Sequence, residues 1–188
     1  MDRAHEQQQQ GASADAARGG GSFQKTAIAD RSETTFRFLA EPTSVNFGGK
    51  VHGGALMKWI DEAAYACAAM WSGRYAVTVS VGNIRFRRPV HVGNLVEIRA
   101  KIVATGRTSM HIHVSVHAGD PKEGELEMTT DCLVVFVAVD SNGRPMPVPS
   151  FEPVTDEQKR LANYAHDVRA ALDAIVELKP DEVASGKV

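Results

Sequence analysis

The alternation of hydrophobic and polar residues changes its period twice along the chain. In residues 33–40 the two kinds alternate one by one, which predicts a β-strand. In residues 56–71 apolar side chains recur every three or four positions, as on the buried face of a helix. Alternating or wholly apolar segments rich in β-branched residues return in 76–89, twice within 94–118 and in 127–140. The predicted order is therefore one strand, a long helix and four antiparallel strands, with turns near Gly93, Gly106, Pro121 and Asn142–Gly143.

The helix of residues 56–71 has few polar positions, so its surroundings must cover it on several sides. A curved antiparallel β-sheet wrapped around one long central helix does this, which is the α+β hotdog fold. The segment 127–140 is apolar on both faces between Cys132 and Val139, and a strand covered on both faces lies centrally in its sheet. We therefore expect a single hotdog domain in residues 26–153.

The two ends of the chain differ from this domain in composition. Residues 1–25 combine a glutamine tract with alanine, serine and glycine. Such a composition buries too little apolar surface to offset the entropy of ordering, so we expect a disordered tail. Residues 154–188 begin with Thr155 as a helix N-cap and space their apolar residues for an amphipathic helix that ends before Pro180. This helix can pack on the domain, cover a neighbouring subunit or fray, and the sequence does not choose between the three.

Composition and charge narrow the class of protein. The 188 residues carry a formal charge of −2 and are 43% hydrophobic, which gives no electrostatic reason to expect a nucleic acid or an anionic membrane as partner. The two cysteines, Cys67 and Cys132, lie in apolar surroundings, so we expect buried, reduced thiols. The N-terminal stretch lacks the apolar core of a secretory signal, and no run approaches about 20 apolar residues. We expect a cytoplasmic protein with no membrane partner.

Asp61 is an acid in the middle of an otherwise apolar helix. Helical spacing places Met57 and Ala64 on its side. A carboxylate among small apolar groups is partly desolvated, which strengthens it as a base. On the residues alone, a helix-surface acid that pairs with Lys58 or solvent is an equal alternative. For its neighbour Glu62, a surface ion pair with Lys58 is the simpler interpretation.

A glycine-rich loop leads into this helix. The run Asn46-x-x-Gly49-x-x-His52-Gly53-Gly54, followed by ALMKWIDEA, resembles the signature of the hotdog acyl-CoA thioesterases, the family of cytosolic long-chain acyl-CoA hydrolases and their small bacterial relatives. VGNIRFRRPVHVGNLVEI resembles that family's second strand pair, GRTSM the turn that follows, and FVAVDSNGRPMPVP its last strand and exit. The resemblance covers about residues 32–150 and keeps the order of the motifs.

The resemblance implies hydrolysis of fatty acyl-CoA thioesters to free fatty acid and coenzyme A, with no cofactor beyond the coenzyme A of the substrate. It makes Asp61 the catalytic acid, as base or nucleophile. It makes Asn46 orient the water or the carbonyl, although an asparagine here also favours a turn. His52 becomes a binding residue beside Gly53. The N–H of Gly54 suits the developing oxyanion, because glycines at a helix start let a carbonyl approach unpaired N–H groups.

Coenzyme A carries three phosphate groups, which arginine and lysine side chains bind in proteins. Arg88 lies at a strand end and Arg107 in a Gly-Arg-Thr-Ser turn. We expect both to contact the nucleotide or the diphosphate. A solvated basic edge of the sheet is the alternative explanation for these arginines.

Three histidines, His111, His113 and His117, fall on one face of one predicted strand. Histidines at such spacing can bind zinc, but no carboxylate or cysteine accompanies them at suitable spacing. The polar face of an amphipathic strand explains them better, and we predict no metal. The sequence also lacks a P-loop, a GxSxG elbow and a paired CxxC, which argues against phosphoryl transfer, the usual serine hydrolases and structural zinc.

A single hotdog sheet leaves one edge unpaired and its acyl groove half built, so pairing of two chains is expected. The resemblance places the site at that dimer interface, with the loop of one chain facing the helix acid of the other, and favours a hexamer built as a trimer of dimers.

Two other functions compete with thioester hydrolysis. One is that of a hydratase or dehydratase acting on a β-hydroxyacyl thioester, which needs a histidine base, and His52 is the candidate. The other rival is a catalytically silent acyl-CoA-binding module.

Overall fold

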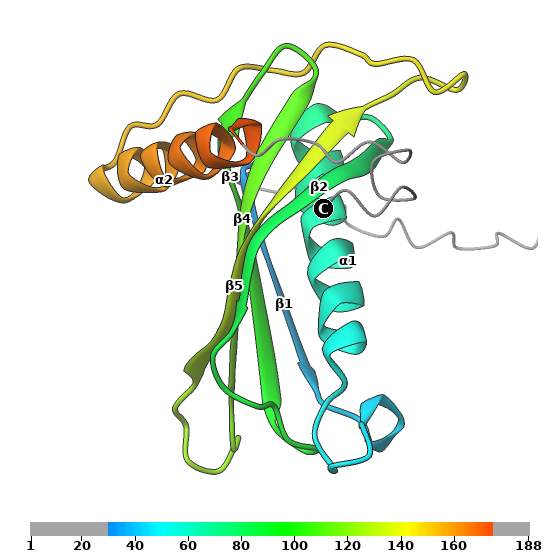
Figure 1. Cartoon of the computed structure of the whole chain (residues 1–188), viewed down its shortest axis with the longest axis vertical. Helices are drawn as coiled ribbons and strands as arrows, with labels where there is room; N and C mark the ends of the chain where they lie inside the picture. Colours follow the sequence, from blue (N-terminus) through cyan, green and yellow to red (C-terminus); the bar gives the residue numbers. More distant parts are fainter. Residues whose placement is uncertain (1–29, 175–188) are drawn as a thin grey trace, which may run out of the picture.

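The computed structural model describes residues 30–174 of the chain. Along the chain these residues form the strand β1 (Glu33–Leu39), the 3-10 turn η1 (Pro42–Ser44), the long helix α1 (Gly53–Ser72), the strands β2 (Ala76–Phe86), β3 (Leu95–Thr105), β4 (Ser109–Gly119) and β5 (Glu127–Ala138), and the helix α2 (Asp156–Asp173). The predicted order of a strand, a long helix and four strands is confirmed (Figure 1). The expected tail of residues 1–25 and the last part of the segment 154–188 lie outside the described residues.

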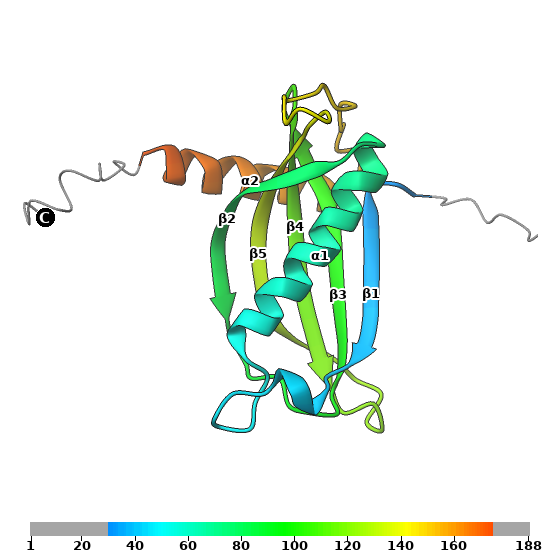
Figure 2. The ribbon, with the colours of Figure 1, turned by 90° about the vertical axis from the view of Figure 1, so that its right-hand side faces the viewer.

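The five strands form one antiparallel sheet in the order β1-β3-β4-β5-β2. β1 pairs with β3 from Glu33↔Lys101 to Leu39↔Leu95, whereas β2, the next strand in sequence, crosses to the far edge and pairs with β5. The two helices lie on opposite faces of this sheet: α1 covers one face, here called the inner face, and α2 lies on the outer face (Figures 1 and 2). This is the predicted α+β hotdog architecture.

The core lies between α1 and the inner face of the sheet. The helix buries a stripe that is rich in small side chains, which lets it approach the strands closely. This stripe consists of Leu56, Ile60, Ala63, Ala64, Cys67 and Ala68. On the opposite side of the helix Lys58, Asp61, Glu62 and Tyr65 are exposed. The expectation that the helix is surrounded is therefore wrong for a single chain, because one sheet face covers only one side of it.

β5 lies inside the sheet, between β4 and β2, but it is not the middle strand. Both of its faces are apolar because both are covered. Val134 and Phe136 belong to the core beneath α1, and Leu133 packs with residues of α2 on the outer face. β5 is thus apolar on both faces because a helix covers each face, and not because β5 is the middle strand.

Both cysteines are buried and unbonded, as expected from the sequence. Burial raises the pKa of the Cys67 thiol and of the Cys132 thiol to about 12. Both groups therefore stay protonated near neutral pH and behave as small apolar side chains.

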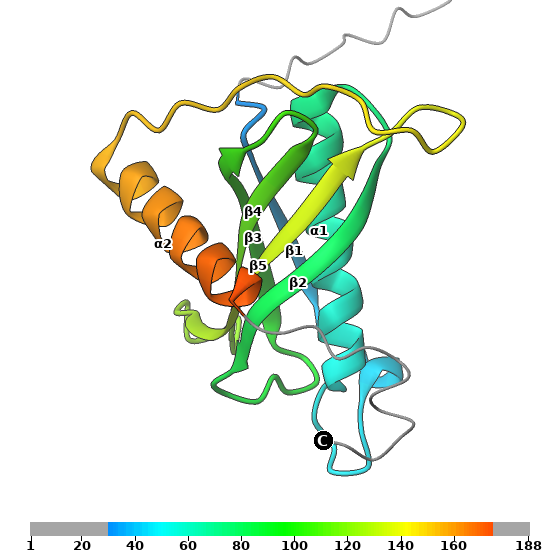
Figure 3. The ribbon, with the colours of Figure 1, turned by 45° about the horizontal axis from the view of Figure 1, so that its top comes forward.

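α2 packs on the outer face of its own sheet, which is one of the three arrangements that the sequence left open (Figure 3). Its predicted N-cap is confirmed: Thr155 Oγ1 accepts the N–H of Gln158 at 3.1 Å, and the Gln158 side chain accepts the N–H of Thr155 at 3.0 Å. The apolar contact joins Val103 and Leu133 of the sheet to Leu161, Tyr164, Ala165 and Val168 of the helix. Of the helices in the described part of the chain, none is long and apolar enough to cross a membrane.

Candidate active site

The loop before α1 is a tight turn that Asn46 holds with its side chain. Asn46 Oδ1 accepts the N–H of Gly48 at 2.9 Å and that of Lys50 at 3.3 Å, and the Asn46 N–H donates to the Lys50 carbonyl at 2.7 Å. Gly49 has φ +72°, a left-handed conformation that suits glycine. The side-chain oxygen of Asn46 therefore serves the turn, and its amide NH₂ is the part of the side chain that can donate to a substrate.

α1 begins at a histidine cap. His52 is the N-cap residue, and its Nδ1 accepts the N–H of Gly54 at 2.8 Å. The N–H that the sequence assigned to the oxyanion is thus occupied in this structure. A carbonyl oxygen can take this hydrogen bond only if the imidazole of His52 turns away.

Asp61 lies on the exposed side of α1, next to the edge strand β2. The hydroxyl of Thr78, on β2, donates a 2.6 Å hydrogen bond to Asp61 Oδ1. This bond fixes the orientation of the carboxylate and leaves its other oxygen free to face a reactant. Lys58 pairs with Glu62 at 3.6 Å, as predicted, so Asp61 is not the partner of Lys58.

Sequence reasoning missed Thr78. The residue sits in a segment that reads as an ordinary β-branched strand, and it is seventeen positions from Asp61 in another element. One feature of the sequence pointed to Thr78. A strand that directly follows a helix runs back alongside that helix, so polar residues of the strand come to lie next to the helix acid.

Within one chain, the predicted oxyanion donor and the predicted catalytic acid lie too far apart to act on the same carbonyl group. Gly54 and Asp61 lie seven residues apart on α1, which is roughly 10 Å along the helix axis. A base and an oxyanion donor must each lie within about 3 Å of neighbouring reacting atoms. One protomer therefore offers a donor loop at one place and an acid at another.

A hollow of about 290 Å³ adjoins the loop. Asn46, Gly53 and Arg88, three of the predicted site residues, line it together with Leu56 and Phe86. Arg88 also forms an ion pair with Glu127, and both side chains are largely exposed. The structure thus brings the glycine loop and one of the two predicted phosphate ligands to the same place.

Arg107 lies far from this hollow. It belongs to the turn between β3 and β4, and the full length of β3 separates that turn from Asn94, which bonds to Ala40 near the loop. The carbonyl of Arg107 accepts the N–H of Val148, which holds the chain after β5 against this turn. Within one chain Arg88 and Arg107 cannot bind the same phosphate.

The three histidines of β4 face the outer side of the sheet, away from Asp61. His111 is buried, and His113 lies edge-on against the ring of Tyr164 of α2, with the ring centroids 6.1 Å apart. Burial lowers the pKa of His111, His113 and His117. They were predicted to form a polar strand face, and that face proves to be largely covered. In the described part of the chain, no group of three or more potential metal ligands has a suitable geometry.

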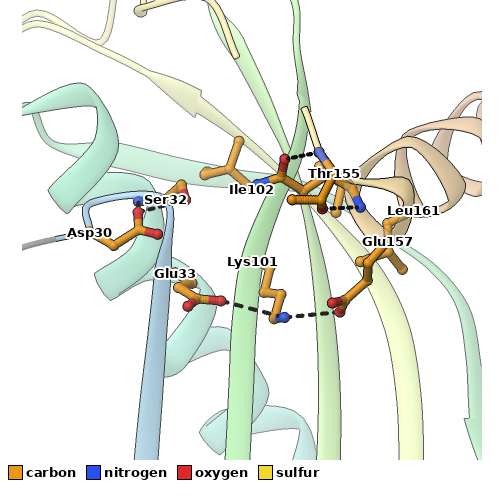
Figure 4. Close-up of a pocket in the computed structure, with 10 residues that line it drawn as sticks. Asp30, Ser32, Glu33, Lys101, Ile102, Thr155, Glu157 and Leu161 are labelled. Atoms are coloured by element: carbon orange, nitrogen blue, oxygen red, sulfur yellow. Dashed lines mark hydrogen bonds and ion pairs between the residues drawn. The ribbon is translucent and has the colours of Figure 1, made fainter. Parts of the chain in front are cut away.

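A second hollow, on the outer face, surrounds Lys101 (Figure 4). Lys101 Nζ lies 3.4 Å from a carboxylate oxygen of Glu33 on β1 and 3.0 Å from one of Glu157 on α2. At this hollow, ion pairs therefore connect the sheet to the first turn of α2. It lies on the opposite face of the sheet from Asp61.

Comparisons with known proteins identify relatives of this chain and of its fold. Residues 48–125 match the family model of the thioesterase superfamily. Over 132 residues the chain is 37% identical to the protein VdlD of Helicobacter pylori, an alignment that covers 70% of this chain and 75% of that one. It is 36% identical to the acyl-CoA thioester hydrolase YciA of Salmonella typhimurium over 62% of this chain and 90% of that one. The crystal structure of an apo-hexameric acyl-CoA thioesterase superposes with a TM-score of 0.72 at 35% identity, over 78% of this chain and 96% of that one.

Proposed function

The chain belongs to the thioesterase superfamily, and from this premise we propose that it hydrolyses fatty acyl-CoA thioesters to free fatty acid and coenzyme A. The observation that carries the proposal is the exposed carboxylate of Asp61, held by the Thr78 hydroxyl at the open edge between α1 and β2. An acid fixed at 2.6 Å and open to a reactant on its other oxygen suits a general base or a nucleophile.

Asp61 acts on the thioester carbonyl carbon. As a base, it accepts a proton from a water molecule whose oxygen adds to that carbon; as a nucleophile, its own oxygen adds and water later releases the acid. In both routes the C–S bond breaks, and the coenzyme A thiolate leaves and takes up a proton. Thr78 keeps the carboxylate aligned throughout, and it is therefore a positioning residue of the proposed site.

The negative charge that develops on the carbonyl oxygen needs hydrogen-bond donors. We assign these to the amide of Asn46 and to the N–H of Gly54, once His52 has turned away from it. Because the loop and Asp61 of one chain are roughly 10 Å apart, the donors come from a second chain that faces the acid. His52 then borders the bound thioester together with Gly53.

A dimer formed about a two-fold axis reverses one chain relative to the other, so opposite ends of the two sheets meet. Arg88 of one chain and Arg107 of the other then approach the same site, which supports their assignment to the phosphates of coenzyme A. We propose a dimer at least and a trimer of dimers as the full assembly. The acyl-CoA thioesterase of known structure that superposes at 35% identity is itself hexameric. The proposed enzyme uses no cofactor and acts in the cytoplasm.

The hydratase alternative is less well supported. It needs a histidine as base, for which His52 is the candidate near the loop, whereas the relatives YkhA of Bacillus subtilis and YciA of Salmonella typhimurium are both named as acyl-CoA thioester hydrolases. The non-catalytic binding module remains the competing function, and the release of thiol separates the two.

The first experiment measures thiol release from acyl-CoAs of increasing chain length by the wild type, Asp61→Asn and Asp61→Ala. We expect turnover by the wild type and a loss of roughly a hundredfold or more in both variants, the usual size of a general-base effect. Glu62→Gln is the matched control, since it removes the adjacent acid of the same helix, and it should keep its activity. Binding of acyl-CoA by the wild type without thiol release would replace the hydrolase by the binding module.

A further inference from the structure

Phe47 is fully exposed, with a relative accessibility of 114%, at the tip of the glycine loop. Its neighbours Gly48 and Gly49 offer no side chain to cover it. The turn that carries it is fixed by the Asn46 side chain and by the hydrogen bond from the Gly49 N–H to the Asn46 carbonyl at 3.0 Å. The loop thus displays an aromatic ring on a well-braced turn, directly beside a residue of the proposed site.

A second group of exposed aromatics lies one helical turn beyond Asp61. Tyr65 is four residues after Asp61 and so projects on the same side of α1. Its ring packs edge-on against Tyr75, at a centroid distance of 6.0 Å and an interplanar angle of 60°, and tilts against Phe136 of the core at 6.4 Å. Tyr75 is 61% exposed. The pair is anchored on one side and open on the other.

Two-fold pairing of two chains along β2 would bring these two groups together. β2 is an edge strand of 11 residues that exposes Val79 and Val81. With the axis near the middle of the strand, Tyr75 lies roughly 20 Å to one side of it and Phe86 roughly 17 Å to the other, at about 3.3 Å per residue. Phe86 adjoins Gly53 at the loop, since a Cβ added there would lie 3.9 Å from the Phe86 ring. The loop of one chain therefore arrives level with Tyr75 of the other.

We propose that Phe47 of each chain closes over Tyr65 and Tyr75 of its partner, and that these three rings form the wall against which the acyl chain packs beyond the scissile carbonyl. The proposal rests on the thioesterase function and adds to it the residues that select acyl-chain length. The side chains at this junction differ in chemistry. The rings and the neighbouring β2 valines offer apolar surface, whereas Lys50 and Arg88 lie at the hollow beside the loop, where they suit the phosphates of coenzyme A.

The test is a chain-length profile, from acetyl-CoA to palmitoyl-CoA, of the wild type, Phe47→Ala and Tyr75→Ala. We expect the loss in kcat/KM to grow with acyl length in both variants, from slight for acetyl-CoA to about tenfold or more for palmitoyl-CoA, because the buried apolar contact grows with the chain. Val154→Ala is the control: this exposed valine lies between β5 and α2, outside the wall, and its replacement should leave the profile unchanged.

Co-expression of the Phe47→Ala chain with the Tyr75→Ala chain tests the assignment to two different chains. In a mixed dimer one of the two walls combines the intact Tyr75 of one chain with the intact Phe47 of the other, and the second wall lacks both. Long-chain activity should therefore recover to about a quarter of the wild-type value after random pairing. If both rings came from the same chain, no intact wall would form and no activity would return.

Three results would overturn the proposal. The first is an unchanged chain-length profile of kcat/KM in Phe47→Ala, and the second is a loss of kcat/KM that is equal for all acyl lengths, as expected if the ring stacked on the adenine of coenzyme A. The third is no recovery of long-chain activity on co-expression. Oligomeric state is measured for each variant. If the Phe47→Ala oligomer dissociates, Phe47→Trp is tested in its place, because a larger ring should shorten the longest acyl chain that the enzyme accepts. A wild type that releases no thiol from any acyl-CoA refutes the hydrolase function itself, which is a different outcome from an active wild type with an insensitive Phe47.

Discussion

At the scale of single residues, Asp61 and Thr78 form the unit on which the proposed chemistry depends. The Thr78 hydroxyl donates to a carboxylate, and a hydrogen bond to a charged group contributes about 1.5–3 kcal/mol. Most of its effect here is expected in the orientation of Asp61, because both residues are exposed in the single chain and the substrate meets the free oxygen. Thr78 therefore supports a reaction without itself touching the reacting atoms.

We predict that Thr78→Val lowers kcat about tenfold to a hundredfold while KM changes little, because the shape is kept and the hydrogen bond is lost. Thr78→Ser retains the hydroxyl and should keep most of the activity. Steady-state kinetics on one acyl-CoA, with the thermal midpoint of each variant, check this. Equal rates for the valine variant and the wild type would show that Asp61 is oriented by something else.

The same scale shows the limit of reading the site from the sequence. Asn46 and Gly53 were selected by motif and resemblance, and Arg88 by the need of coenzyme A phosphates for cationic partners; all three line one hollow. The occupied N–H of Gly54 could not be foreseen, because it depends on the rotamer of His52. Local patterns identify residue types at a helix start, but side-chain contacts between elements follow from packing.

At the scale of elements, α2 covers part of the outer sheet face and buries histidines. Burial lowers the pKa of His111, with Arg169 adding to the effect, and lowers that of His113, which also faces Lys101, Asp131 and Glu157. A folded-state pKa below the unfolded value of 6.5 means that the unfolded chain binds more protons as the pH falls through this range. Stability is therefore full above about pH 6.5 and decreases below it.

We predict that the free energy of unfolding, measured by urea denaturation, falls between about pH 7 and pH 5, and that His113→Gln makes this fall shallower. Carboxylates contribute little in this window: the hydrogen bond from Lys101 lowers the pKa of Glu157 below its usual 4.5, so its contribution is lost only at more acidic pH. His166→Gln is the control, since this side chain is exposed on α2. An identical slope for His113→Gln and the wild type would contradict the assignment.

The elements themselves followed well from the sequence, because alternation and helical spacing depend on burial of one face. The long helix, the five strands and the Thr155 cap were all predicted near their observed positions. The strand order was not, because a two-residue period indicates that a strand is half buried and leaves its partner open. Likewise an amphipathic helix such as α2 matches any apolar surface, so its place on the outer face had to come from the structure.

At the scale of the whole molecule, the sheet has two edges of different character. β1 carries charged side chains that pair with its neighbour, Glu33 with Lys101 and Arg37 with Glu97. β2 instead exposes valines. Natural edge strands use charges to prevent pairing with other chains, so β1 is protected and β2 is the edge suited to a second copy.

We predict that Val79→Lys on β2 dissociates the assembly and abolishes thioesterase activity together with it, because a lysine in an apolar strand interface is buried without a partner. Light scattering coupled to size exclusion gives the mass, and thiol release gives the activity. Val154→Lys introduces the same charge at an exposed site between β5 and α2 and should change neither. A fully active monomer would place the whole site in one chain.

The spacing of Gly54 and Asp61 along one helix has a kinetic consequence. If each reaction centre draws on two chains, a solitary protomer is idle, and the rate per chain depends on how many protomers have met. Specific activity would then decline on dilution towards the dissociation constant of the pair, and the cell could set turnover through the abundance of the protein alone.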